Sequence, residues 1–312
     1  MSILDTKQKT KDQHIVPKRH LKNFAIFNSN KLECLNVDAL RIEKNQSPES
    51  ICKGYFYYAL EPGIEDEYSQ MVENNFNKIE DWYGKNIDRI EKQLISKQLL
   101  SNTDKYAISW IIANFYFRGY KHRHKIKKVL ADLMDWLNPI FTESIHRKIL
   151  KDYPEKFSKV EEAKKILHKT TKEFLSRQAN NTSYATSSAF DEGFANILTH
   201  KKWQILINNS NEYPFITGDE AVIETTNDQI PKDNFSQSFL FLTHLFHLSP
   251  KIAIIASYPF DEKMHGQVVF EDITENIQAI CKNNLLYANY TYKYCYAPNK
   301  LFFDVLIKSN KK

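Results

Sequence analysis

Cations alternate with aromatic and imidazole rings over residues 118–128, which read RGYKHRHKIKK. A phosphate backbone attracts cations, and rings beside them offer stacking surfaces to bases. The run therefore predicts a nucleic-acid-binding surface formed by Lys121, Arg123, Lys125 and Lys128. An alternative stays open, because these cations spread around a helix and are also typical of a solvated C-terminal half, where the helix dipole favours positive charge.

Other residue patterns exclude several classes of site. The four cysteines form no CxxC pair, which argues against a structural zinc site, and we expect free thiols. The chain has only 7 glycines in 312 residues and contains neither GxGxxG nor GxxxxGK[ST], so nucleotide folds built on those loops are not expected. His244 and His247 are three residues apart in a predicted strand, where they would face opposite sides.

Composition and the N-terminal residues indicate a cytoplasmic protein. Lys and Arg number 43 against 38 Asp and Glu, a net charge of +5. The start, MSILDTKQKTKDQ, lacks the apolar core of a signal peptide. The most apolar helical stretch, 108–117, is shorter than the roughly 20 residues that cross a bilayer. We therefore expect no membrane partner, and the oligomeric state stays open.

Helical periodicity dominates the middle of the chain. A long helix is predicted from about Glu65 to Leu99, with apolar residues on one face. Ser101 and Asp104 fit a capping box, so the next helix begins there, and it is expected to end near Leu137, before a proline. A lysine-rich helix over about 154–178, a flexible loop over 178–188 and a short helix over 190–200 follow.

Strand-like alternation replaces this period from Trp203 onward. The predicted class is α+β, with long central helices and an antiparallel or mixed sheet built mainly from the C-terminal third. We expect a flexible tail at 1–12 and one domain at 13–312, helical over about 65–200 and strand-rich over about 201–312. Two further strands, within 31–38 and 51–60, are expected to join the same sheet, and 292–307 is expected to form a strand or hairpin.

The stretch QHIVPKRHLKNF, residues 13–24, resembles the opening of the bacterial domain of unknown function 4238 family, which reads QHxVPxxxLxxF. The matching positions are Gln13, His14, Val16, Pro17, Leu21 and Phe24. In VENNFNKIE, Glu73 and Glu80 are similar to the paired glutamates on the first long helix of that family. NFYFRG resembles a segment that carries an arginine, here Arg118.

A fourth segment, PFITGDEAVI at 214–223, resembles the PFITSDxPV of the same family, with Asp219 as its acid. The chain departs from that pattern at Gly218, where a serine is expected, and at Glu220 and Ala221, where a residue followed by proline is expected. It also has Gly119 where a threonine is common. These departures concern the conformation of the loops.

The resemblance implies a set of five residues that could do chemistry: His14, Glu73, Glu80, Arg118 and Asp219. Carboxylates beside a histidine could act as general acid and base or bind a divalent cation such as magnesium or manganese, with Glu80 and Asp219 as its ligands. The arginine could hold a phosphate by two hydrogen bonds. The leading interpretation is a nucleic-acid-directed phosphodiester hydrolase, acting as a bacterial defence or toxin-type effector.

Two alternatives stay open for these residues. The glutamates could pair with Arg118 or a lysine in a helix-to-helix salt bridge, while His14 caps a backbone group and Asp219 holds a turn. The protein would then be a non-catalytic module that binds nucleic acid or protein. Separately, Arg118 and His124 show the spacing Rx5H, which resembles the Rx4–6H motif of the HEPN ribonucleases. That resemblance implies a helical, metal-independent dimer in which His124 is the base and Arg118 stabilises the phosphorane.

Overall fold

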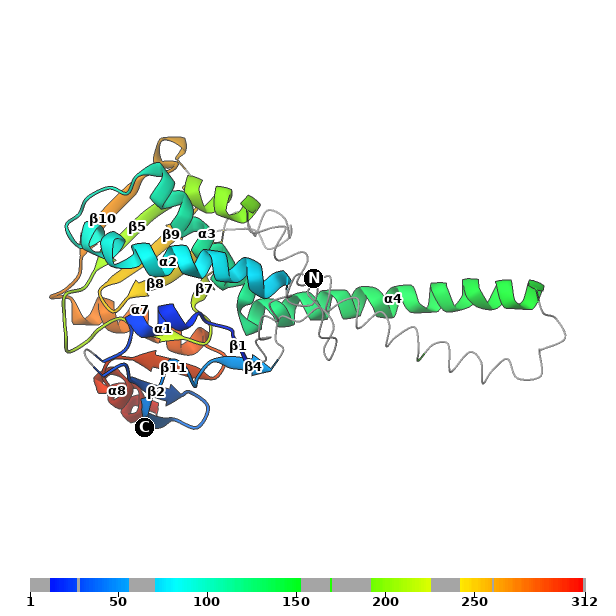
Figure 1. Cartoon of the computed structure of the whole chain (residues 1–312), viewed down its shortest axis with the longest axis horizontal. Coiled ribbons are helices and arrows are strands. Elements are labelled where there is room, and N and C mark those ends of the chain that lie inside the picture. The colour runs from blue at the N-terminus through cyan, green and yellow to red at the C-terminus, as the bar shows by residue number, and fades with distance from the viewer. Residues whose placement is uncertain are drawn as a thin grey trace, which may run out of the picture.

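The computed structural model describes residues 12–26, 29–55, 71–152, 169, 192–225, 242–259 and 261–310. Long helices follow one another in the middle of the chain and most strands come after them, so the fold is α+β, as the sequence predicts (Figure 1). Residues 1–11 of the tail predicted at 1–12, nearly all of the lysine-rich helix at 154–178 and the predicted loop at 178–188 lie outside the described residues. The last residue of the predicted tail, Asp12, begins strand β1.

The larger sheet has five strands in the order β10-β5-β9-β8-β7. The members are β5 (Lys202–Ile207), β7 (Val222–Thr225), β8 (Thr243–Ser249), β9 (Ile252–Ser257) and β10 (Val268–Asp272). All neighbours are antiparallel except β10 and β5, which are parallel, so the sheet is mixed. Alternation along β5 places Trp203, Ile205 and Ile207 in one core and Leu206 in another, because successive side chains point to opposite faces.

The N-terminal strands do not join this sheet, so the prediction of a single sheet is wrong. A four-stranded antiparallel sheet has the order β3-β2-β11-β6, and β1 pairs with β4. These strands are β1 (Asp12–His14), β2 (Leu32–Asn36), β3 (Arg41–Gln46), β4 (Lys53–Tyr55), β6 (Thr217–Gly218) and β11 (Tyr294–Ala297). The segment that contains β6 and β7 has the pattern of one strand, but it leaves one sheet after Gly218 and enters the other at Val222.

Helices cover both faces of the larger sheet. On one side lie α2 (Met71–Ile95) and α3 (Asn102–Arg118), whose buried Tyr83, Ile87 and Ile112 share a core with β5, β8 and β9. On the other side lies α7 (Ile277–Tyr290), which contributes Tyr287 to the second core. The last helix, α8 (Leu301–Asn310), packs on α7 and contributes Phe303 to the same core. The short helix α1 (Lys18–Asn23) packs on α2 and β8, and a further helix spans residues 192–200.

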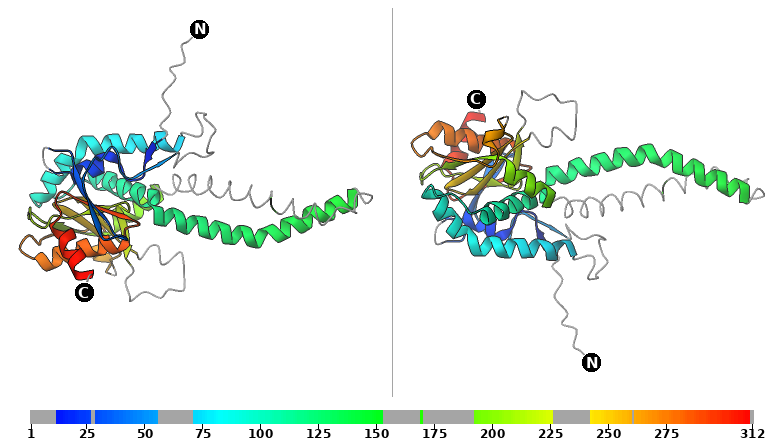
Figure 2. Two further views of the ribbon diagram at one scale, coloured as in Figure 1. Left: turned by 90° about the horizontal axis from the view of Figure 1, so that it is seen from below. Right: turned by 90° about the horizontal axis from the view of Figure 1, so that it is seen from above.

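The helix that the sequence predicts from Ser101 to Leu137 is in fact two helices. It stops at Arg118 because Gly119 takes an extended conformation with ψ at 149°, and α4 (Tyr120–Asp152) begins on the next residue. The expected stop before Pro139 is also wrong, since α4 continues through it; an internal proline costs a helix about 3 kcal/mol but does not forbid it. Over most of its length α4 projects away from the sheets (Figures 1 and 2).

The C-terminal residues also differ from the prediction. A strand or hairpin is expected over residues 292–307, but only β11 is extended and α8 follows it. Phe302 and Leu306 are four residues apart and both buried, which is a helical spacing that the preceding alternation of YCYA obscures. Among the described residues, no helix has both the length and the apolar composition that crossing a membrane requires.

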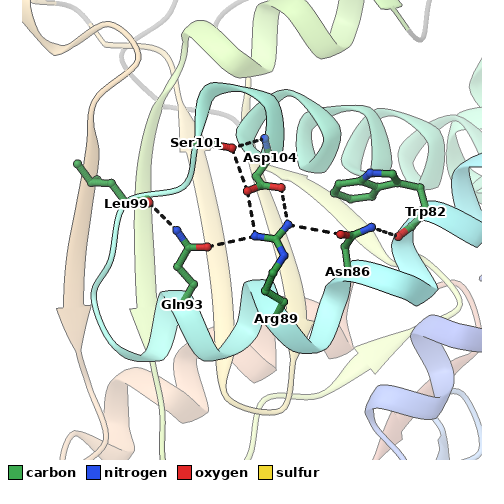
Figure 3. A network of polar contacts seen from close by, with 7 residues as sticks. All are labelled: Trp82, Asn86, Arg89, Gln93, Leu99, Ser101 and Asp104. Carbon is green, nitrogen blue, oxygen red and sulfur yellow. Dashed lines mark hydrogen bonds and ion pairs between the residues drawn. The ribbon is translucent and has the colours of Figure 1, made fainter.

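The predicted capping box at the start of α3 is confirmed. Ser101 Oγ accepts a hydrogen bond from the backbone N–H of Asp104 at 3.1 Å and donates to the carboxylate of Asp104 at 2.9 Å. The same carboxylate accepts hydrogen bonds from both terminal nitrogens of Arg89 on α2, at 2.6 and 3.1 Å (Figure 3). The cap therefore also joins the two helices that cover the sheet.

Replacing the cap residue should measure its contribution. Ser101→Ala removes the acceptor for an otherwise unpaired N–H, so we expect a loss of about 1 kcal/mol in the free energy of unfolding. Urea unfolding at fixed pH measures it. Thr103→Ala, which changes an exposed residue in the same turn, is the control. Equal stability of the two variants would contradict the assignment of the cap.

Candidate functional site

Arg118 is the centre of a buried cluster that joins three elements. Its side chain is 1% exposed, and its guanidinium donates to Oε1 of Glu80 at 2.5 Å and to the backbone carbonyl of His14 at 2.5 Å. The guanidinium carbon also lies 4.5 Å from the centre of the Phe76 ring. A buried cation needs such partners to offset the loss of hydration. The cluster thereby fastens the end of α3 to α2 and β1.

Two further predicted residues, His14 and Glu73, belong to β1 and α2, the elements that Arg118 joins to α3. The imidazole Nε2 of His14 donates to the carbonyl of Pro48 at 3.1 Å, and burial lowers the pKa of His14 below its ordinary value. Glu73 lies on α2 two turns before Glu80, but its side chain is outside the described part of the structure. His14, Glu80 and Arg118 thus come together as an ion pair between helices with a capped backbone group.

Asp219 lies elsewhere and holds a turn. One carboxylate oxygen accepts hydrogen bonds from the hydroxyl of Thr291 at 3.0 Å and the N–H of Tyr292 at 2.8 Å. The other accepts from the N–H groups of Lys293 and Tyr294, at 2.8 and 3.0 Å. The side chain is 2% exposed, so these four donors replace its water. Asp219 therefore fixes the segment 291–294 that leads into β11.

The neighbouring acid, Glu220, binds the backbone at the start of α4. Its Oε1 accepts the backbone N–H of Lys121 at 2.6 Å, which places a carboxylate at the first turn of the helix. Burial and the nearby charge of Asp219 raise the pKa of Glu220 to about 8, against the opposing effect of these N–H groups. Two adjacent residues of the chain thus bind two distant backbone segments, the start of α4 and the turn before β11.

Two departures from the family pattern make room for these contacts. A β-carbon on Gly119 would lie 2.1 Å from the carboxylate of Glu220, and one on Gly218 would lie 2.0 Å from the hydroxyl of Thr291. A threonine or serine at these positions would push aside the groups that cap α4 and bind Asp219. The two glycines therefore allow Glu220 and Thr291 to take these positions.

The two carboxylates predicted to bind metal do not fit a shared divalent cation. Both oxygens of Asp219 face N–H and O–H donors, and Glu80 faces the guanidinium of Arg118. Magnesium and manganese need lone pairs that are free to point at the ion. Within the described residues, no group of three His, Cys, Asp or Glu side chains is arranged to hold a metal.

Arg118 and His124, the pair expected from the HEPN resemblance, lie on separate helices with separate partners. Gly119 separates them, and the guanidinium of Arg118 is committed to the buried cluster. His124 is exposed on α4, where its ring centre lies 6.4 Å from that of Tyr292. The described contacts thus give the two side chains no common site.

The four cations of the predicted binding surface are residues of the first turns of α4. Lys125 pairs with Glu224 of β7, whose carboxylate also accepts the hydroxyl of Tyr116 at 2.6 Å, and 58% of the lysine side chain stays exposed. The ammonium of Lys121 lies 4.0 Å from the ring centre of Tyr290. Arg123 is partly buried and Lys128 is exposed. The four cations therefore surround one end of a projecting helix.

Two histidines on β8 face opposite cores, as their spacing predicts. His244 lies beside Lys201, with Nδ1 and Nζ 3.3 Å apart, whereas His247 Nδ1 lies 2.6 Å from the carbonyl of Ile216. Burial lowers the pKa of Lys201 to about 7, that of His247 to about 3 and that of His244 well below its ordinary value. Both histidines are thereby kept neutral inside the protein.

Sequence reasoning missed Glu220 and Tyr292. In the sequence, Glu220 stands out only as a departure from a pattern, and Tyr292 falls in a stretch that is predicted to be a strand. The sequence does contain a signal for Glu220, because two adjacent acids in an apolar run must find donors if they are buried. The hydrogen-bond donors to Asp219 and Glu220 are more than 70 residues away in the chain, so no local sequence pattern reveals them.

The fold and the site define an α+β protein in which paired carboxylates fasten a projecting basic helix to the smaller sheet. The chain belongs to the family described as protein of unknown function (DUF4238), whose model matches residues 12–300. The resemblance of the sequence motifs to this family is thereby confirmed. The chain matches no curated protein and no solved structure.

Gly119 allows a direct test of the contact between Glu220 and α4. Gly119→Ala would force the carboxylate off its backbone donors, so we expect a loss of about 1–3 kcal/mol in the free energy of unfolding. Chemical denaturation measures it. Gly193→Ala, whose new methyl group would meet nothing within 4 Å, should be neutral or stabilising. A Gly119→Ala protein as stable as the parent would refute this packing.

The raised pKa of Glu220 predicts a pH dependence. The folded protein holds this proton up to about pH 8, whereas the unfolded chain loses it near pH 4.3, so stability should fall as the pH rises between these values. Glu220→Gln keeps an oxygen acceptor and removes the titration. Urea unfolding from pH 6.5 to 8 should show a shallower decline in the variant, by about 1 kcal/mol per pH unit. Parallel curves for the two proteins would rule out the raised pKa.

Proposed function

We propose that the protein binds nucleic acid through the first turns of α4, as a non-catalytic binding module. The supporting observation is the charge of this helix. It has eight Lys and Arg against four Asp and Glu, a net charge of +4, while the whole chain has +5. A projecting helix that carries nearly all of the net charge is the surface that a polyanion meets first.

Two of the four basic residues, Lys125 and Lys128, are exposed to solvent. The ammonium of Lys125 pairs with Glu224, yet 58% of the lysine side chain is exposed, so a phosphate could approach it from the solvent side. Lys128 is exposed one turn further along α4. Phosphate groups spaced along a strand could therefore reach both ammonium groups from one side of the helix.

The nucleic-acid-directed hydrolase and its role as a cytoplasmic defence effector stay predictions from the sequence. His14, Glu80, Arg118 and Asp219 each have partners that stabilise the fold, so the binding function needs fewer assumptions. The same samples test the hydrolase. Shortening of RNA or DNA that needs magnesium or manganese and stops with EDTA would favour it over the binding module.

The salt dependence of binding tests the proposal. Lys125→Gln with Lys128→Gln should weaken binding of a labelled single-stranded oligonucleotide and lower the slope of log K against log salt by about 1.4, because each phosphate that a lysine neutralises contributes about 0.7 to this slope. Fluorescence anisotropy at several salt concentrations gives both values. Lys263→Gln with Lys308→Gln removes the same charge from exposed positions on other elements and should leave the slope unchanged. Equal slopes for both double variants would overturn the proposal.

A further inference from the structure

Three rings line up beside the basic start of α4. Tyr120 stacks on Tyr292 with ring centres 4.8 Å apart and planes inclined by 26°, and His124 lies 6.4 Å from Tyr292 on the same helix as Tyr120. Tyr292 is 49% exposed. A tyrosine ring exposed beside cations offers an aromatic face on which another ring could stack. We call Tyr120, His124 and Tyr292 the ring platform.

Hydrogen bonds to two buried acids fix the backbone segments that carry the platform tyrosines. Tyr292 belongs to the turn whose N–H groups bind the carboxylate of Asp219, and Tyr120 belongs to the helix start that Glu220 caps. The two tyrosines are therefore far apart in the chain but are fixed by adjacent acids. A ring that is already ordered loses little conformational entropy when a ligand stacks on it.

Two exposed cations are close neighbours of the platform residues in the chain. Lys293 follows Tyr292 directly and is exposed, while Lys128 lies one turn beyond His124 on α4. Rings between cations can stack bases and neutralise the phosphates between those bases. In a duplex the base faces are covered by their neighbours and only base edges are accessible, so a stacking surface has nothing to bind.

We infer that the ring platform makes the protein selective for single-stranded nucleic acid, with a base stacked on Tyr292. This inference rests on the proposed binding function of α4 and adds to it the class of ligand. The competing account is that Tyr292 merely packs α4 against the turn. In that case its apolar surface matters and its aromatic face does not.

Two substitutions separate these accounts. Tyr292→Phe keeps the aromatic ring. Tyr292→Leu keeps an apolar side chain that can pack against Tyr120, but it has no aromatic face. The ligands are a labelled 12-nucleotide single strand and a duplex of the same length, titrated by anisotropy at one salt concentration. Tyr258→Ala, a half-buried tyrosine after β9, is the control, and thermal unfolding checks that each variant is folded.

We expect the parent protein to bind the single strand more tightly than the duplex. Tyr292→Leu should weaken single-strand binding about tenfold and leave duplex binding unchanged, while Tyr292→Phe stays close to the parent. Equal affinity of the parent for both ligands, or an unchanged affinity in Tyr292→Leu, would overturn the inference and leave the proposed function in place. Failure of the parent to bind either ligand would refute both.

Discussion

The structure depends on two adjacent carboxylates that are buried and must find hydrogen-bond donors. Asp219 and Glu220 are 2% and 3% exposed, and leaving either without partners would cost several kcal/mol. The donors come from backbone N–H groups of a turn near the C-terminus and of the first turn of α4. Because the acids are neighbours, these two segments are brought side by side. The same two residues, with Ala221, form the segment that separates β6 from β7 and connects one sheet to the other.

This constraint links the fold to the proposed function. Three contacts anchor the start of the projecting helix α4. They are the hydrogen bond to Glu220, the ion pair of Lys125 with Glu224 and the stacking of Tyr120 on Tyr292. The same contacts bring cations and rings together at the start of α4. Arg118 acts in a comparable way at the end of α3, where its buried charge joins α2 and β1. Buried acidic and basic side chains therefore determine which elements of this protein meet.

The sequence predicted what depends on local pattern. Alternation located β5, β8 and β9, and the apolar face of α2 and the capping box of α3 were also correct. It failed where a distant contact decides the local conformation. The extended backbone at Gly119 ends α3, and the carboxylate of Glu220, 101 residues further on, occupies the space that a β-carbon at Gly119 would need. The motif residues Arg118 and Asp219 could be identified by resemblance, but their partners, and so their roles, required three-dimensional contacts.

Hydrogen exchange of individual segments tests the role of the paired acids most directly. In the parent protein, the amides of residues 292–294 should exchange slowly, because they donate to a buried carboxylate. Asp219→Ala should accelerate exchange in this turn by at least about tenfold while β8 and β9 stay protected. If the turn exchanged at the same rate in both proteins, Asp219 would not be what holds it, and the central claim would be wrong.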